Sequence, residues 1–227
     1  MSCRFSVIEI FMSVESHLVN TLDVQSFPLW PLLALPLFGA AITYSLGKIN
    51  RKISGWSATA FSFLSFLWVL NIFTSRHTGV TLEDNLFLWF SVGDLSLDFA
   101  LRFDGLTSVM CLVITGIGTL IHLYSVGYMA EEEDAPRFFS YLNLFMFSML
   151  TLVLGANFLV LFVGWEGVGL CSYLLIGFWY RNSDYASAGR KAFVVNKIGD
   201  LGFLIAVFLL LREFGTIDFI ELKEAFS

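Results

Sequence analysis

The sequence predicts an all-α polytopic membrane protein, with about six transmembrane helices and a short extramembrane β-hairpin between the second and third. Of its 227 residues 57% are hydrophobic and only 14% are charged, unlike an ordinary soluble domain. Several apolar runs reach the roughly 20 residues that a helix needs to cross the hydrocarbon core of a bilayer. A short alternating stretch between two of these runs predicts the hairpin. Lipid is therefore the expected solvent.

The first 27 residues are predicted to be an N-terminal extension that precedes one membrane domain, residues 28–227. Glu9, Glu15, His17 and Asp23 interrupt the continuous apolar core that a cleaved signal peptide requires. No internal repeat, low-complexity tract or proline-rich linker divides the remainder of the chain. One domain accounts for it.

Six spans follow from the length of the apolar runs and from the residues that flank them. The predicted spans are residues 29–47, 55–74, 104–129, 138–154, 157–180 and 192–211. Only Gly155, Ala156 and Asn157 separate the fourth from the fifth, which is a tight turn signal. These two spans are therefore expected to form an antiparallel helical hairpin.

Residues 78–102, between the second and third spans, carry the β pattern. Apolar side chains alternate on both sides of a central Val92, Gly93 and Asp94, as in a two-stranded hairpin. The alternating residues are Leu86, Leu88, Phe90, Leu95, Leu97 and Phe99. The hairpin should lie over one face of the membrane.

The orientation of the spans follows from the basic residues of the short loops. One side carries Lys48, Arg51, Lys52, Arg137, Arg181, Arg190 and Lys191, and the other carries Arg4, Arg76, Arg102, Arg212 and Lys223. The first side is predicted to be cytoplasmic. The expected location is the bacterial plasma membrane, with the mitochondrial inner membrane as the alternative.

Charge and cysteine content add little about partners. The net charge of −6 owes much to a run of four acidic residues at 131–134, which is typical of a solvated loop. We expect no nucleic-acid partner. Cys3, Cys111 and Cys171 are too widely spaced for a disulfide framework or a metal-binding pair, so no metal is predicted and buried thiols are the expected state.

Glu166 is the first candidate functional residue, because it interrupts the fifth apolar span far from either end. An ionisable group at this depth is costly and marks a functional position by default. Burial favours the protonated acid and a nearby cation favours the carboxylate, so a movable cation would let Glu166 take up and release protons. The alternative is a permanently protonated Glu166 that only joins helices.

The sixth span contributes Lys197 and Asp200, beside Asn196. Residues three apart share one face of a helix, so Lys197 and Asp200 can neutralise each other or extend a polar track. An ordinary ion pair at the membrane interface is the competing interpretation.

His122 is the remaining candidate, at one end of a polar stripe on the third span. The stripe comprises Asp104, Ser108, Cys111, Thr115, Thr119 and His122. Hydroxyls of this kind often bond to their own helix, so bundle packing around a neutral His122 competes with proton conduction. A weaker polar stripe on the fourth span leaves the same two interpretations open, helix packing and proton conduction.

The glycines around Glu166 suit close helix packing. Gly164, Gly167 and Cys171 recur at helical spacing and form a small face that lets another backbone approach. A dinucleotide-binding interpretation fails, because no strand leads into this helix.

Several motifs resemble the subunit L family of NADH-quinone oxidoreductase, the large antiporter-like membrane subunit of respiratory complex I. The closest resemblance lies in RFFSYLNLF at 137–145 and GWEGVGLCSYLLIGF at 164–178. AFVVNKIGD at 192–200, LRFDGL at 101–106 and HLYSVGYM at 122–129 are also similar to that family and occur in the same order. The resemblance extends over about residues 29–227 and includes the large subunit of multisubunit Na⁺/H⁺ antiporters.

The resemblance implies a subunit that translocates protons while other subunits oxidise NADH with quinone. It implies no redox cofactor and no direct NADH binding in this chain, with other complex I membrane subunits and the bilayer as partners. Glu166 matches the central glutamate of the family's WEGVGLCSY motif, and Asp200 matches the aspartate of its sixth helix. The family pairs that glutamate with a lysine on a later, broken helix.

That later helix lies beyond Ser227, so the chain is expected to be an N-terminal fragment with an unpaired, protonated Glu166. In a family with inverted five-helix repeats, it would hold three leading helices and three helices of the first repeat. Two other functions stay open. The chain could belong to a multisubunit Na⁺/H⁺ antiporter, or it could be a truncated membrane scaffold without catalytic function.

Overall fold

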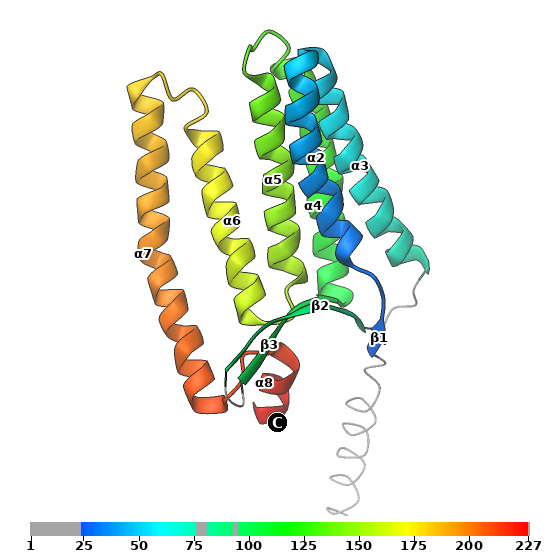
Figure 1. Ribbon diagram of the computed structural model, residues 1–227, viewed down its shortest axis with the longest axis vertical. Coiled ribbons are helices and arrows are strands. Elements are labelled where there is room, and N and C mark those ends of the chain that lie inside the picture. The colour runs from blue at the N-terminus through cyan, green and yellow to red at the C-terminus, as the bar shows by residue number, and fades with distance from the viewer. Residues whose placement is uncertain (1–23, 76–80, 93–94, 227) are drawn as a thin grey trace, which may run out of the picture.

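The computed structural model describes residues 24–75, 81–92 and 95–226 and contains six long helices, which stand side by side (Figure 1). All six are long and apolar enough to cross a membrane. They are α2 (Trp30–Ile49), α3 (Arg51–Ser75), α4 (Gly105–Tyr128), α5 (Ala135–Leu154), α6 (Phe158–Ile176) and α7 (Ser183–Phe214). The predicted all-α membrane fold is confirmed.

The bundle has two distinct ends. The connections from α2 to α3, from α4 to α5 and from α6 to α7 lie together at what we call the basic end (Figure 1). The opposite, or hairpin, end carries the strands and the short helix α8 (Phe219–Phe226). The predicted grouping of the loops by side is therefore confirmed for the described residues, while Arg4 and Arg76 lie outside them. The cytoplasmic orientation of the basic end stays a prediction.

The helix ends differ from the predicted spans where polar residues continue a helix. α7 begins at Ser183 rather than at residue 192, because the Asn182 side chain accepts a hydrogen bond of 2.9 Å from the Asp184 backbone N–H and caps the helix. The C-cap of α7 is Gly215, which adopts a left-handed backbone conformation with a φ of 72°. α6 ends at Ile176 rather than at residue 180. Hydropathy located the membrane-crossing parts of these helices but not their caps.

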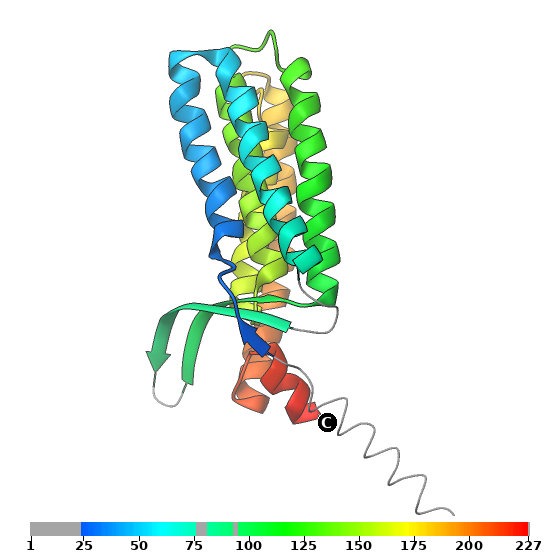
Figure 2. The ribbon, with the colours of Figure 1, turned by 90° about the vertical axis from the view of Figure 1, so that its right-hand side faces the viewer.

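The predicted hairpin is confirmed as β2 (Thr81–Val92) and β3 (Leu95–Phe103), with Val92 paired to Leu95. It projects sideways below the helices (Figure 2). Two register shifts, at 85/87 and 88/90, interrupt the pairing of the two strands. Leu88 and Phe90 are both exposed.

A third strand was not predicted. β1 (Val24–Ser26) pairs in parallel with the start of β2, within the stretch that the sequence assigned to the N-terminal extension. Residues 1–23 of that extension lie outside the described residues. The hairpin also holds the start of α2, since the Asp84 carboxylate accepts hydrogen bonds of 2.6 and 3.0 Å from the backbone N–H groups of Leu29 and Trp30.

A buried core joins the hairpin to the five helices α2–α6. Its fully buried members come from all five helices and from both strands of the hairpin, and they include Leu32, Ile72, Leu82, Leu101, Leu150 and Val160. The strands are thus packed into the same core as the helix ends.

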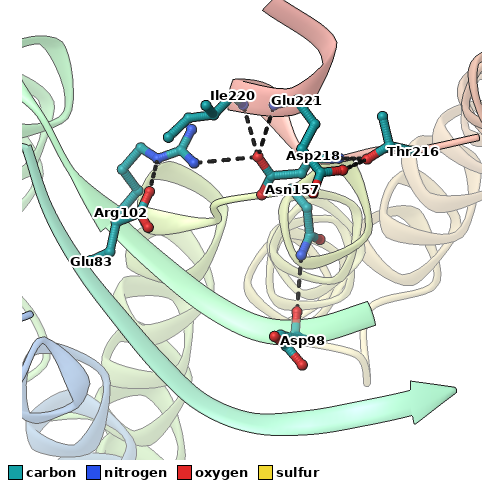
Figure 3. Close-up of polar contacts among 8 residues, drawn as sticks. All are labelled: Glu83, Asp98, Arg102, Asn157, Thr216, Asp218, Ile220 and Glu221. Carbon is teal, nitrogen blue, oxygen red and sulfur yellow. Dashed lines mark hydrogen bonds and ion pairs between the residues drawn. The ribbon is translucent and has the colours of Figure 1, made fainter. Parts of the chain in front are cut away.

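Polar contacts at the hairpin end fix the start of α6 (Figure 3). Asn157 caps α6, because its Oδ1 accepts from the backbone N–H groups of Leu159 and Val160 at 3.1 and 2.9 Å. Its Nδ2 donates to the Asp98 carbonyl on β3 at 2.9 Å. One side chain thereby sets the height of α6 relative to the hairpin.

Arg102 ties α8 to the same strands (Figure 3). Its guanidinium lies 2.8 Å from Glu83 on β2 and 3.5 Å from Asp218. Asp218 in turn caps α8 by accepting from the Ile220 backbone N–H at 2.8 Å. The end of α7 is therefore connected to the hairpin through α8.

α5 and α6 form the antiparallel hairpin predicted from their turn, and they pack through the predicted small-residue face. A Cβ on Gly164 would overlap the backbone of Leu152, and one on Gly167 would lie 2.6 Å from the Ser148 hydroxyl. Cys171 Sγ lies 3.9 Å from the same hydroxyl. Because the helices meet at the backbone, α6 has little freedom to slide along α5.

We expect Gly164→Ala to destabilise the chain by about 1–3 kcal/mol, since α5 and α6 must separate to admit the new methyl group. Gly202→Ala on α7 is the matched control, because nothing lies within 4 Å of the added Cβ, and it should stabilise slightly or have no effect. Thermal unfolding in detergent, followed by circular dichroism, measures both. Equal melting temperatures for the two variants would contradict this packing.

Candidate functional site

Glu166 on α6 is paired, contrary to the expectation of an unpaired acid. The ammonium group of Lys197 on α7 donates a hydrogen bond to Glu166 Oε2. The expectation was wrong because the family resemblance places the cation that pairs with this glutamate on a helix beyond Ser227. An antiparallel neighbour such as α7 brings Lys197 back to the same depth.

Asp200 is the third member of the cluster. Its Oδ2 accepts from Lys197 Nζ at 3.0 Å, so Lys197 lies between two carboxylates. A contact between Lys197 and Asp200 is one of the arrangements that their spacing allowed. The other oxygen of Asp200, Oδ1, accepts a hydrogen bond of 2.7 Å from the Trp165 indole N–H. Both oxygens of this carboxylate are therefore engaged.

The two carboxylates differ in exposure. The side chain of Asp200 is 5% exposed, whereas those of Glu166 and Lys197 are 31% and 32% exposed. The Phe193 ring lies 4.9 Å from Lys197 Nζ and adds a cation–π contact. Asp200 is thus a fixed counter-ion, and Glu166 is the carboxylate with access to its surroundings.

A cavity of about 250 Å³ lies between α6 and α7 on the basic side of this cluster. Its polar lining comprises Ser172, Tyr173 and Asn196, and its floor includes Trp165 and Gly169. A Cβ on Gly169 would lie 2.6 Å from Asn196 Nδ2, so glycine at this position leaves room for the Asn196 side chain. The volume and the polar groups suit several water molecules.

Aromatic rings fill the space between α6 and α7 on the opposite side of the cluster. Phe203 on α7 stacks on Phe162, with ring centroids 5.5 Å apart and planes 15° apart, and on Trp165, at 6.5 Å and 7°. Phe158 lies next, 6.3 Å from Phe203. The cluster therefore lies between a cavity with three polar residues in its lining, towards the basic end, and stacked rings, towards the hairpin end.

His122 lies apart from the cluster, on α4. Its side chain is 2% exposed, and its Nδ1 lies 2.7 Å from the Gly118 carbonyl of its own helix. The adjoining cavity, of about 270 Å³, is lined almost entirely by apolar residues of α4, α5 and α6. No hydrogen bond or ion pair within residues 24–75, 81–92 and 95–226 joins His122 to Glu166, Lys197 or Asp200. These contacts favour the packing interpretation, and a relay role for His122 stays a prediction.

The rest of the α4 stripe is mostly engaged in local hydrogen bonds. Asp104 caps α4 by accepting from the Thr107 backbone N–H at 2.8 Å. The Thr115 and Thr119 hydroxyls each donate to a carbonyl one turn earlier at 2.7 Å. These hydroxyls are hydrogen-bonded within their own helix, which is one of the two possibilities that the sequence left open. Both cysteines in the described chain, Cys111 and Cys171, are buried and free, as predicted.

Two parts of the site escaped sequence reasoning. Trp165 was treated only as a neighbour of Glu166 in the motif, and Phe203 only as one of 25 phenylalanines. The relative rotation of α6 and α7 decides that both point into the interface, and hydropathy carries no information on that rotation. A count of residues back from the α6–α7 turn could have found Lys197 as the partner of Glu166.

Two family models match the chain. Residues 89–139 match the N-terminus of chain 5 of NADH-ubiquinone oxidoreductase, complex I. Residues 155–227 match the transmembrane model of NADH:quinone oxidoreductase and the Mrp antiporter, and this match includes the cluster.

Curated relatives agree with these models. NADH-quinone oxidoreductase subunit L of Mycobacterium tuberculosis is 44% identical over 197 residues, which cover 84% of this chain and 31% of the relative. NADH-ubiquinone oxidoreductase chain 5 of Metridium senile is 42% identical over 190 residues, which cover 83% of this chain and 32% of the relative. The chain spans about a third of the length of these relatives.

A solved structure agrees as well. The Mrp complex from Dietzia sp. DQ12-45-1b superposes with a TM-score of 0.70 at 26% identity, over 82% of this chain and 20% of the matched chain. The related proteins are thus subunits of multisubunit membrane complexes. With the six apolar helices, the bacterial relatives indicate an integral protein of the bacterial plasma membrane. The chain belongs to the family of antiporter-like membrane subunits that NADH-quinone oxidoreductase and Mrp antiporters share.

Proposed function

We propose that this chain takes part in proton translocation as a membrane subunit of NADH-quinone oxidoreductase, with Glu166, Lys197 and Asp200 as the relay. The chain itself contributes no redox chemistry, which belongs to other subunits. One observation carries the proposal: a cation lies between two carboxylates at mid-membrane depth, in contact with both. An intramembrane cluster of this kind is costly to maintain for packing alone.

The relay depends on which carboxylate holds the Lys197 ammonium. While Lys197 contacts Glu166, the glutamate is stabilised as an anion. When Lys197 shifts fully to Asp200, Glu166 loses its counter-ion and takes up a proton from the cavity side. The return of Lys197 expels that proton to an acceptor in the part of the relatives that this chain does not span. Trp165 keeps Asp200 in place throughout, because its N–H holds the oxygen that Lys197 does not use.

The asymmetry around the cluster sets the side from which the proton enters. Protons reach Glu166 through the cavity that Ser172, Tyr173 and Asn196 line. The stacked rings of Phe162, Phe203 and Trp165 oppose passage towards the hairpin end, because a proton crosses an apolar layer poorly without water. A charge change in a neighbouring subunit supplies the shift of Lys197.

We expect Phe203→Ala to open this barrier and to cause a proton leak. Inverted membrane vesicles would build a smaller pH gradient with NADH, and the gradient would collapse several-fold faster once NADH is exhausted, while NADH oxidation continues. Phe208→Ala on the same helix is the control, since that ring is 63% exposed and should not affect the leak. Equal collapse rates for both variants would remove the aromatic barrier.

The Mrp match supports a second candidate, a subunit of a Na⁺/H⁺ antiporter. Vesicles from cells with and without the gene distinguish the two. Loss of NADH-driven proton uptake on deletion, with Na⁺-driven proton movement unchanged, supports the complex I proposal. Loss of Na⁺-driven movement alone supports the antiporter. If neither changes, the chain has no transport role in these membranes and is a scaffold.

A further inference from the structure

A groove of about 210 Å³ opens at the basic end between α3, α4 and α5, away from the proposed relay. Arg51 and Lys52, in the first turn of α3, form its polar rim. Apolar groups form its walls, namely Gly55, Val126, Met129, Ala135 and Phe139. A cationic rim above an apolar trough is the shape of a site for an amphiphile with an anionic head.

The cations at this rim have no counter-ion in the described chain. Lys48 and Arg51 lie on either side of the turn between α2 and α3, and Lys52 follows directly. Among residues 24–75, 81–92 and 95–226, none of the three takes part in an ion pair, and residues 28–82 contain no Asp or Glu at all. Lys48 Nζ instead lies 4.6 Å from the Tyr44 ring.

The acidic loop at residues 131–134 is the nearest source of negative charge, but two of its side chains are engaged on the far side. Glu132 accepts a hydrogen bond of 2.9 Å from the Trp179 indole. Asp134 pairs with Arg137 at 3.0 Å. Both partners lie towards α6, so these two carboxylates are held away from Arg51 and Lys52.

The side chains around the groove place it at the level of lipid headgroups. Trp56, which also lines the groove, is 61% exposed, and exposed tryptophan in a membrane helix is typical of the membrane–water interface. Ile49 and Ile53 are exposed beside the cations. Apolar side chains and basic groups therefore share one surface at the membrane boundary.

We propose that this groove binds one anionic phospholipid, with its phosphate between Arg51 and Lys52 and an acyl chain along Val126 and Phe139. Charge complementarity selects an anionic over a zwitterionic lipid, since basic pockets between transmembrane helices bind anionic headgroups. The apolar walls select a lipid over free phosphate. The inference is independent of the proposed proton relay.

Native mass spectrometry of the purified full chain tests the site with two lipids of identical acyl chains, dioleoyl-phosphatidylglycerol and dioleoyl-phosphatidylcholine. We expect preferential retention of phosphatidylglycerol. The double substitution Arg51→Gln and Lys52→Gln should weaken its binding by about 30-fold. Arg181→Gln with Arg190→Gln removes two exposed cations at the same end and should leave the preference intact.

A second variant tests the groove without altering its charge. Ala130→Trp, at an exposed position in the lining, should obstruct the acyl chain and weaken phosphatidylglycerol binding while both cations remain. It also provides the test if the Arg51/Lys52 double variant does not fold by circular dichroism. Equal retention of the two lipids, equal loss in both charge variants, or displacement of the lipid by millimolar inorganic phosphate would each overturn the proposal.

Discussion

Glu166→Gln should reduce NADH-driven proton pumping on the order of tenfold or more, because glutamine fills the same space but cannot carry a proton. The variant keeps Lys197 paired with Asp200 at 3.0 Å, so we expect the cluster to stay intact and the protein to assemble. Quenching of a pH-sensitive acridine dye in inverted membrane vesicles, compared with the rate of NADH oxidation, measures protons moved per NADH.

Glu133→Gln is the matched control for this experiment. It removes one carboxylate from an exposed loop and should leave the ratio of protons to NADH unchanged. If Glu166→Gln pumps at the normal ratio, Glu166 is not a relay group, and its contact with Lys197 serves only to join α6 to α7.

Lys197→Met should have a larger structural effect than Glu166→Gln and should also abolish pumping. It leaves Glu166 and Asp200 together without their shared cation, and breaking a buried pair by removing one partner costs up to about 3–5 kcal/mol. The cost should fall below that range here, because Lys197 and Glu166 are about a third exposed. Without Lys197 no cation can exchange between Glu166 and Asp200, so the step on which the relay depends is lost.

A double variant separates structure from transport. Adding Glu166→Gln to Lys197→Met removes the acid that Lys197→Met leaves unpaired, so it should recover part of the lost thermal stability without recovering pumping. Lys197→Arg, which retains the charge, should keep the fold and part of the activity. Additive losses of stability in the double variant would mean that Lys197 and Glu166 do not interact.

The six helices could be predicted because each apolar run had to be long enough to cross the bilayer. Their boundaries were less certain, since capping by Asn182 and the left-handed Gly215 depend on local polar groups that hydropathy ignores. β1 could not be predicted, because a three-residue strand is defined by pairing with Thr81 and its neighbours, far along the chain. The hairpin was predicted, but not its two register shifts.

Within the candidate site, the chemical types were predictable but the partnership was not. Glu166, Lys197 and Asp200 were identified as costly intramembrane charges, and the Lys197–Asp200 contact followed from their spacing on one helix. Glu166 lies about ten residues from the end of α6, and Lys197 lies about one helical turn deeper in α7, which a lysine side chain can span. The matching depth of Glu166 and Lys197 could therefore be derived from the sequence, whereas the family resemblance indicated a lysine on a later helix.

The contact between Trp165 and Asp200 also makes the relay optically visible. An indole that donates to a carboxylate oxygen at 2.7 Å experiences the local electric field, so a shift of Lys197 between its two acids would move the fluorescence emission of Trp165. The other five of the six tryptophans can be subtracted with a Trp165→Phe protein. The emission of Trp165 would then report the position of Lys197, and it could be followed without any attached dye.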